Sequence, residues 1–264
     1  MRIDLHGKTA IVTGSTAGIG LAIASSLAHA GAHVVVTGRT QARVDTAIAT
    51  IKQDVPNAKL FGVSGDLGTH EGAQQLISEV PDADILVNNL GIFEPKAFFD
   101  IPDDDWLRFF EVNVLSGIRL ARHYAQGMAK RGWGRIQFIS SESGVQIPAE
   151  MVHYGTTKTA QLAVSRGLAE TLAGTGVTVN AILPGPTRSE GVGDFFGKIA
   201  AEKGIAQEEV ERDFIATHRP TSLIKRLATV EEVANLSTYL ASEQASATTG
   251  AAVRVDGGVV RSIV

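Results

Sequence analysis

The sequence predicts an α/β protein built on a doubly wound parallel sheet of about seven strands, with helices on both faces. Short β-branched apolar runs recur along the 264 residues, and helix-like stretches of ten or more residues separate nearly all of them. No Pro/Gly/Ser-rich linker, charge block or internal repeat divides the chain. With 44% hydrophobic residues, residues 1–264 are expected to form a single domain with one large core.

The first strand, turn and helix give the strongest local pattern. Residues 8–12 form an apolar run typical of a buried parallel strand, and the sequence T-G-S-T-A-G-I-G follows at 13–20 before a helix-like stretch. This order directs backbone N–H groups and the positive end of a helix at an anion, so we expect a phosphate or pyrophosphate there. Gly14 allows a tight turn, Gly18 leaves room for a phosphate, and Gly20 lets the helix pack on the strand. An ordinary strand-to-helix turn is the alternative.

The rest of the chain continues the alternation of predicted strands and helices. A strand at 32–37 and a helix at 40–52 complete a βαβ unit, and further strands are predicted at 60–63, 85–87, 135–139, 177–182 and 252–255. Ligands of such sheets bind beyond the carboxyl ends of the strands. Polar segments follow four of these strands, at 66–67, 88–91, 140–144 and 184–187. Each alone is explained as a cap, turn or strand terminator, but together they predict a site along one edge.

Composition excludes several classes of function. The chain has 24 Lys and Arg against 28 Asp and Glu, a net charge of −4, which argues against a nucleic-acid partner or a polybasic membrane patch. The absence of cysteine excludes disulfides, thiolate catalysis and zinc-thiolate sites. The first strand is expected to leave no room for a signal peptide, and no apolar run reaches the roughly 18 residues of a membrane span. We therefore expect a cytoplasmic protein without a membrane partner.

Tyr154 and Lys158 open a long stretch with apolar residues at helical spacing. Their separation of four places both side chains on one helix face. A nearby ammonium favours the phenolate, so the tyrosine pKa is expected to fall towards the range useful for acid/base catalysis. Tyr-x-x-x-Lys alone is common, and a surface aromatic beside a solvated lysine is the ordinary alternative. Here Ser141 lies thirteen residues before Tyr154.

With these motifs together, the chain resembles the short-chain dehydrogenase/reductase family in its compact form, from Lys8 to the V-D-G-G sequence at 255–258. The glycine turn matches the family's T-G-x-x-x-G-I-G, and Asn113 falls at the position of the family's helix asparagine. Ser141, Tyr154 and Lys158 match the other catalytic positions. Leu90 departs from the family pattern Asn-Asn-Ala-Gly, and its larger side chain is expected to tighten the wall beside the cofactor.

The resemblance implies a Rossmann-type fold and hydride transfer between a nicotinamide cofactor and a carbonyl or secondary alcohol. Tyr154 would pass the proton, Ser141 would hold the carbonyl oxygen, Lys158 would lower the tyrosine pKa and bind the ribose, and Asn113 would hold a water. The direction of the reaction stays open. The implied cofactor-binding residues are Gly14, Ser15, Thr16, Gly18, Ile19, Gly20, Arg39, Thr40, Asp66, Leu67, Asn89, Gly91, Tyr154, Lys158, Pro184, Gly185 and Thr187.

The end of the second strand predicts the cofactor. Gly38 stands where an NAD enzyme would place a carboxylate on the ribose, and Arg39 and Thr40 follow with groups suited to a 2′-phosphate. We therefore expect NADP(H) to be preferred, with NAD(H) possible. Ala17 lies where many NADP-using relatives have a second basic residue, so the preference is expected not to be absolute.

Residues 188–225 are the stretch that the sheet explains least. They follow Thr187 and are predicted to form a lid over the substrate, the alternative being a surface helical excursion. Apolar walls for the substrate pocket are expected from Phe93, Val145, Gln146, Ile147, Phe195 and Phe196. The substrate is a small-molecule carbonyl or alcohol whose identity the sequence does not give.

Three further expectations concern assembly and alternatives. The resemblance implies a homo-oligomer, a tetramer, in which the long helices predicted at 105–130 and 152–174 pack between subunits. The valine-rich run at 250–264 would otherwise leave a bare sheet edge, which family members cover with a partner. A non-catalytic nucleotide-sensing or scaffold protein on the same fold is the alternative to an enzyme. A serine hydrolase is excluded because the chain has no G-x-S-x-G elbow.

No metal site is predicted. The three aspartates at 103–105 follow Pro102 and are interpreted as a helix start, where acidic residues are favoured, with a metal cluster as the weaker alternative. The seven histidines form no metal-ligand repeat. His153 adjoins Tyr154, but neighbouring residues on a helix point about 100° apart, so it is expected at the pocket rim or the surface.

Overall fold

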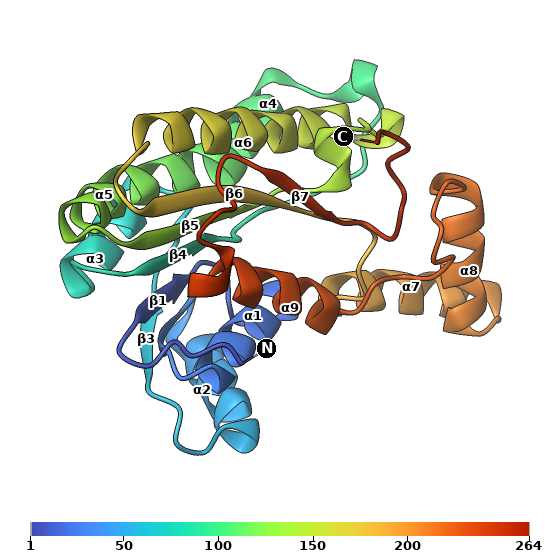
Figure 1. Cartoon of the computed structure of the whole chain (residues 1–264). Helices are drawn as coiled ribbons and strands as arrows, with labels where there is room; N and C mark the ends of the chain where they lie inside the picture. Colours follow the sequence, from blue (N-terminus) through green and yellow to red (C-terminus); the bar gives the residue numbers. More distant parts are fainter. Residues whose placement is uncertain (1, 264) are drawn as a thin grey trace.

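The computed structural model describes residues 2–263, except for the side chains of residues 190, 194 and 195. Its centre is a parallel sheet of seven strands in the order β3-β2-β1-β4-β5-β6-β7, with helices on both faces (Figure 1). The strands are β1 (Thr9–Val12), β2 (His33–Gly38), β3 (Leu60–Ser64), β4 (Ile85–Asn88), β5 (Gly134–Ile139), β6 (Val177–Pro184) and β7 (Ala252–Val255). Each predicted strand overlaps an observed one, so the predicted doubly wound sheet is confirmed.

The helices cover the two faces in two groups. Helices α1, α2 and α9 pack on one face and α3, α5 and α6 on the other. The bounds are α1 (Gly18–His29), α2 (Gln41–Asp54), α3 (His70–Glu79), α4 (Asp103–Phe110), α5 (Ser116–Arg131), α6 (Val152–Thr171), α7 (Glu190–Lys203), α8 (Gln207–His218) and α9 (Val230–Leu240), with the π-helical turn η2 (Glu111–Leu115) joining α4 to α5. Short 3-10 turns occur at η1 (Phe98–Asp100), η3 (Glu142–Gly144), η4 (Ala149–Met151) and η5 (Glu243–Ala245).

Alternation along the strands divides the core into two layers. Val12 and Val34 point to the face covered by α1, whereas their neighbours Ile11 and Val35 point to the face covered by α5. Because both faces are covered, the central strands β1 and β4 are almost entirely apolar, whereas β5 also buries the polar side chains of Arg135 and Gln137. Among residues 2–263 no helix combines the length and the apolar composition needed to cross a bilayer.

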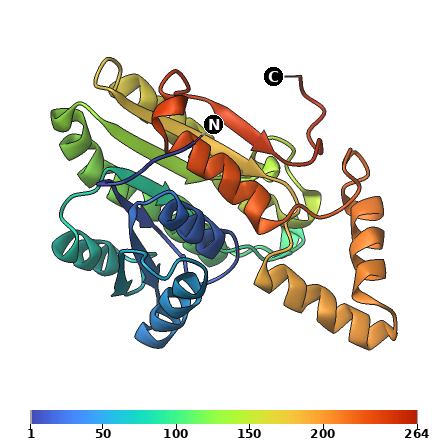
Figure 2. The same ribbon diagram turned by 60° about the horizontal axis from the view of Figure 1, so that its bottom comes forward.

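The strand order places the site. The chain winds from β1 outward to β3 in one direction and from β4 outward to β7 in the other, so the winding reverses between β1 and β4. A crevice outside the carboxyl ends of the strands is expected at this switch point. The segment 188–225 contributes α7 and α8, which share a small apolar core of their own and project beyond the end of the sheet (Figure 2).

Candidate active site

The glycine turn has the geometry that the sequence predicted. Gly14 and Gly18 have left-handed backbones, with φ of +63° and +55°, which residues with a Cβ adopt only at a cost. A Cβ on Gly20 would lie 2.3 Å from the carbonyl oxygen of Gly14. The first turn of α1 therefore packs directly on the loop, and its backbone N–H groups point out of the sheet edge.

Two polar side chains hold this turn in place. The Asn89 amide donates to the carbonyl oxygens of Thr13 and Gly14, at 2.9 and 3.1 Å. The Ser15 hydroxyl donates to Val12 at 2.8 Å and accepts from the Thr37 N–H at 2.9 Å. Ser15 is fully buried, so its side chain shapes the turn and does not face the crevice.

The other predicted cofactor residues lie along the same edge. Arg39 and Thr40 follow β2 and are exposed, and Asp66 follows β3 and accepts from the Gly68 N–H at 3.0 Å, while Leu67 is buried. The side chain of Thr16 packs close to Gly38: a Cβ at position 38 would lie 2.4 Å from its methyl group. A carboxylate at position 38 would therefore displace Thr16.

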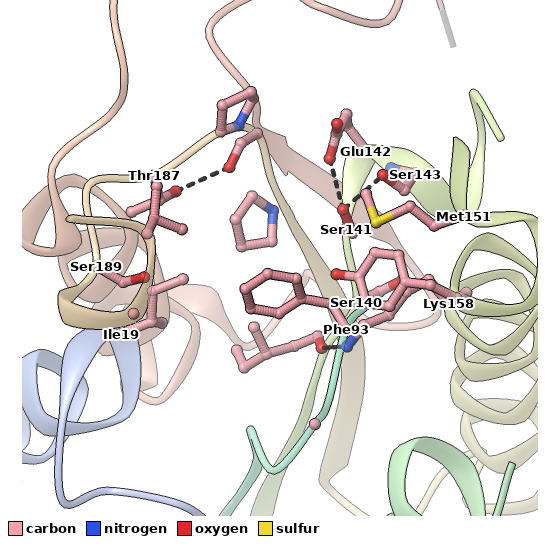
Figure 3. Close-up of a pocket in the computed structure, with 18 of the residues that line it drawn as sticks. Ile19, Phe93, Ser140, Ser141, Glu142, Ser143, Met151, Lys158, Thr187 and Ser189 are labelled. Carbon is pink, nitrogen blue, oxygen red and sulfur yellow. Dashed lines mark hydrogen bonds between the residues drawn. The ribbon is translucent and has the colours of Figure 1, made fainter. Parts of the chain in front are cut away.

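A cavity of about 480 Å³ opens on the β4–β6 side of this edge (Figure 3). Its lining includes these residues from the predicted sets: Ile19, Asn89, Gly91, Ser141, Tyr154, Lys158, Pro184, Gly185 and Thr187. Ser141, Glu142 and Lys158 lie on one side of the view, and Ile19, Thr187 and Ser189 on the other. The size is that of a small-molecule site.

Only some of the residues predicted as apolar walls of the substrate pocket line this cavity. Phe93 and Phe196 line the cavity, together with Met151 and Phe214. Val145, Gln146 and Ile147 are exposed and are not among the described residues that line it, so their prediction as walls is wrong. The side chain of Phe195 lies outside the described part of the chain. Leu90 packs partly on the core formed with α5.

The catalytic candidates meet at this cavity. Ser141 follows β5, and Tyr154 and Lys158 lie one turn apart on α6, with the Lys158 Nζ 5.6 Å from the centre of the Tyr154 ring. The Lys158 Nζ donates to the Ile139 carbonyl at 2.9 Å and to the Gln161 side-chain oxygen at 3.2 Å. The structure thus brings all three residues to the lining of one cavity.

The predicted fall of the Tyr154 pKa is wrong for this structure. Burial, followed by the nearby Glu142 carboxylate, raises the pKa of Tyr154 above its usual range, and the neighbouring Ser141 and Arg219 oppose this only in part. Lys158 does not offset the rise, and its ammonium donates instead to the Ile139 carbonyl and the Gln161 side chain. Tyr154 is therefore a protonated phenol at neutral pH.

Lys158 is itself destabilised as a cation. Burial lowers its pKa from 10.5 to about 8. Below pH 8 the folded protein holds a buried charge that the unfolded chain leaves in water, and this cost disappears as the pH rises from 8 to 10.5.

We predict that the stability of the Lys158→Met variant, compared with that of the wild type, is highest below pH 8, where the wild type carries the buried charge. Between pH 7 and pH 10.5 the unfolding free energy of the wild type should rise by about 3 kcal/mol relative to that of the variant, because the buried lysine loses its charge. Urea unfolding of both proteins across this range measures the change, and the pH-independent loss of hydrogen bonds cancels. A difference that stays constant with pH would contradict it.

Asn113 lies in η2 with its side chain bound to protein groups. Its amide nitrogen donates to Ile92 and Thr157, both at 3.0 Å, and its oxygen accepts from the Ile92 N–H at 2.7 Å. Its backbone carbonyl accepts from the Gln161 side chain at 2.6 Å. The predicted water on Asn113 would need the second lone pair of one of these oxygens. Gln161, which links Lys158 to Asn113, was not singled out from the sequence.

His153 is a further correction. It is neither at the pocket rim nor on the surface but fully buried, with its ring 4.1 Å from that of Phe109 and 6.0 Å from that of Trp106. Burial lowers its pKa, so the ring is neutral. The aspartates at 103–105 begin α4 as predicted, and Asp105 pairs with Lys96. Among the described residues no cluster of three or more His, Asp or Glu is placed to hold a metal.

A buried ion pair beside Ser141 was also missed. Glu142 is 4% exposed and accepts from the Ser141 hydroxyl at 2.5 Å and from the Arg219 guanidinium at 2.9 Å. Arg219 follows α8, and it also bonds to Glu150 at 3.2 Å. Burial alone would lower the pKa of Arg219, but the two carboxylates more than offset this and raise it. The sequence signal was limited to an acidic residue directly after Ser141.

Comparison with known proteins agrees with this geometry. The family model described as enoyl-(acyl carrier protein) reductase matches residues 14–260. The uncharacterized oxidoreductase YvaG of Bacillus subtilis is 50% identical over the full length of both chains. Dehydrogenase/reductase SDR family member 4 of Bos taurus is 35% identical over 97% of this chain and 88% of its own. The structure of L-sorbose reductase from Gluconobacter frateurii with NADPH and L-sorbose matches all of both chains, with a TM-score of 0.92 and 32% identity.

Proposed function

The chain belongs to the short-chain dehydrogenase/reductase family and is an oxidoreductase acting on CH–OH or C=O groups, and we propose that it uses Tyr154 as its general acid/base and prefers NADP(H). One observation carries the proposal. Ser141, Tyr154 and Lys158 line a single cavity that continues from the glycine turn at the switch point of the sheet. The enzyme class argues against the non-catalytic scaffold considered from the sequence.

The crevice fits a dinucleotide on structural grounds. The glycine turn leaves no room for a Cβ at Gly20, and the Asn89 amide fixes the loop whose N–H groups would meet a pyrophosphate. Gly91 and 184–187, which line the cavity, would hold the nicotinamide end. Arg39, exposed after β2, would hold the adenosine end. The bound nicotinamide supplies or accepts the hydride.

The protein side chains handle the proton and the developing charge. In reduction, Tyr154 donates its phenolic proton to the carbonyl oxygen, and a hydrogen bond from Ser141 stabilises the charge on that oxygen. The raised Tyr154 pKa keeps the proton on the phenol at neutral pH. In oxidation the same groups act in reverse. Lys158 would bind the ribose of the cofactor, and its ammonium, if turned towards Tyr154, would favour the phenolate.

The proposal is tested with a panel of ketones and secondary alcohols. Each is incubated with NADPH, NADH or the oxidised forms, and absorbance of the reduced nicotinamide is followed. We expect turnover with some members of the panel and with NADP(H) in preference to NAD(H). Binding of the cofactors without turnover of any ketone or alcohol would instead support the scaffold hypothesis.

The cofactor preference gives a sharper prediction. Arg39→Ala should raise the KM for NADPH by about tenfold and leave the KM for NADH nearly unchanged, because only NADPH has the phosphate that the guanidinium would bind. Lys52→Ala is the control, since Lys52 is an exposed cation in the last turn of the same helix, α2. An equal rise for both cofactors, or a wild-type preference for NADH, would refute the assignment.

We also propose that residues 188–225 act as a lid and that the protein is a cytoplasmic homo-oligomer. Ser189, Val192 and Phe196 of this segment already line the cavity, which supports the lid. Phe99 and Leu107, 96% and 68% exposed, give the α4 side of the molecule an apolar surface suited to a second copy. β7 is an edge strand of the sheet.

A further inference from the structure

The buried carboxylate of Glu142 lies beside Ser141, the residue proposed to hold the reacting carbonyl. Its side chain lines the catalytic cavity and bonds to Ser141 (Figure 3). A serine has one O–H to donate, and here that hydrogen goes to Glu142, while the Ser143 N–H donates to the same Ser141 oxygen at 3.1 Å. As arranged, Ser141 has no hydrogen left for a substrate carbonyl. The proposed reaction requires one.

We propose that Glu142 recognises a hydroxyl group adjacent to the substrate carbonyl, so that the preferred substrates are hydroxy ketones or, in oxidation, vicinal diols. This rests on the proposed function. The substrate hydroxyl donates to Glu142 in place of Ser141, and Ser141 then turns its hydrogen to the carbonyl oxygen. A ketone without the hydroxyl must compete with a carboxylate for the same hydrogen.

The spacing of the groups fits this exchange. The Ser141 and Glu142 oxygens are 2.5 Å apart. The carbonyl and hydroxyl oxygens of a hydroxy ketone sit on neighbouring carbons, and their separation is close to that of two hydrogen-bonded oxygens. One substrate can therefore meet both side chains. Each carboxylate oxygen accepts more than one hydrogen bond, so Glu142 keeps its bond to Arg219.

Arg219 explains why the carboxylate stays in this apolar surrounding. It is 7% exposed, and its Nε bonds to Glu142 at 2.9 Å, which compensates the buried charge. It also connects the end of α8 to the loop after β5. The ion pair thus holds an acceptor at a fixed place in the cavity wall.

The test uses two matched pairs of ketones: acetoin with butanone, and alpha-hydroxyacetophenone with acetophenone. The value of kcat/KM with NADPH is measured for the wild type and for Glu142→Gln. The ratio of hydroxy ketone to plain ketone should fall about 10- to 100-fold in Glu142→Gln, the effect of a hydrogen bond to a charged group. Comparing variants cancels the intrinsic reactivity of each ketone.

The expected change has opposite directions for the two ketones of a pair. The efficiency for the hydroxy ketone should fall, whereas that for the plain ketone should stay or rise, because a neutral amide competes less for the Ser141 hydrogen. A merely structural role for Glu142 would lower both equally and overturn the inference. An unchanged ratio would overturn it as well. Absence of NADPH oxidation with all four ketones would instead count against the proposed function.

The chain offers a matched control and a check on folding. Glu150 bonds to the same arginine at 3.2 Å and is not among the described residues that line the cavity, so Glu150→Gln should keep the wild-type ratio. The double variant Glu142→Met, Arg219→Met removes the whole ion pair at similar volume and avoids an unpaired buried charge. It should also lose the preference for hydroxy ketones, while thermal unfolding and NADPH binding confirm that it folds.

Discussion

Replacing Tyr154 by phenylalanine is expected to lower turnover at least about 100-fold, the usual share of general acid/base catalysis. The ring would keep its edge contact with Phe93, at 6.4 Å between centres, and its contact with Lys158, so the shape of the cavity should be preserved. Only the hydroxyl that we propose as proton donor is lost. Steady-state turnover should therefore fall, whereas the affinity for NADPH, measured by fluorescence, should be retained.

Tyr124→Phe is the matched control. Tyr124 is buried in α5, and its hydroxyl donates to the Val80 carbonyl at 2.7 Å. Removing this hydroxyl should cost about 1 kcal/mol of stability and leave turnover unchanged. If Tyr154→Phe keeps turnover within a factor of a few of wild type, Tyr154 is not the proton donor.

Gly20→Ala should disrupt the cofactor turn. The added Cβ would lie 2.3 Å from the Gly14 oxygen and 2.5 Å from the Asn89 amide nitrogen. Either α1 or the loop must move, and overpacking of this kind costs about 1–3 kcal/mol. Because the loop carries the N–H groups meant for the pyrophosphate, we expect cofactor affinity to fall along with the midpoint of urea unfolding.

Gly167→Ala is the control for Gly20→Ala, because it makes the same substitution in a helix away from the glycine turn. Gly167 is exposed on α6, and a Cβ there would meet no atom within 4 Å. Alanine should stabilise that helix by up to about 1 kcal/mol without changing cofactor affinity. If Gly20→Ala kept wild-type stability and cofactor affinity, the close packing of α1 on the glycine turn would not be required for either.

The sheet was predictable because its strands are coded locally. A strand buried on both faces is rich in apolar residues, so runs such as 85–87 can be recognised in the sequence. The glycine turn at 13–20 follows from the backbone conformations that only glycine adopts easily. The positions of Ser141 and Lys158 followed from their place after a strand and on a helix. These are properties of short segments.

The rest depends on contacts between distant segments. Glu142 and Arg219 are 77 positions apart and meet only because the end of α8 returns to the loop after β5. The Tyr154 pKa depends on burial and on Glu142, which the spacing to Lys158 does not report. For His153, helix geometry predicted a direction away from Tyr154, but not that the rings of α4 would cover it.

Helices α7 and α8 have a small apolar core that is separate from the core of the sheet. Phe196, Ala200, Val210 and Ile215 pack with one another and with Leu227, apart from the two cores on the sheet. Local stability follows the apolar contacts that a segment makes, so we expect α7 and α8 to open at a lower free energy than the sheet. The enzyme would then lose its substrate wall on warming while the dinucleotide half of the molecule stays folded.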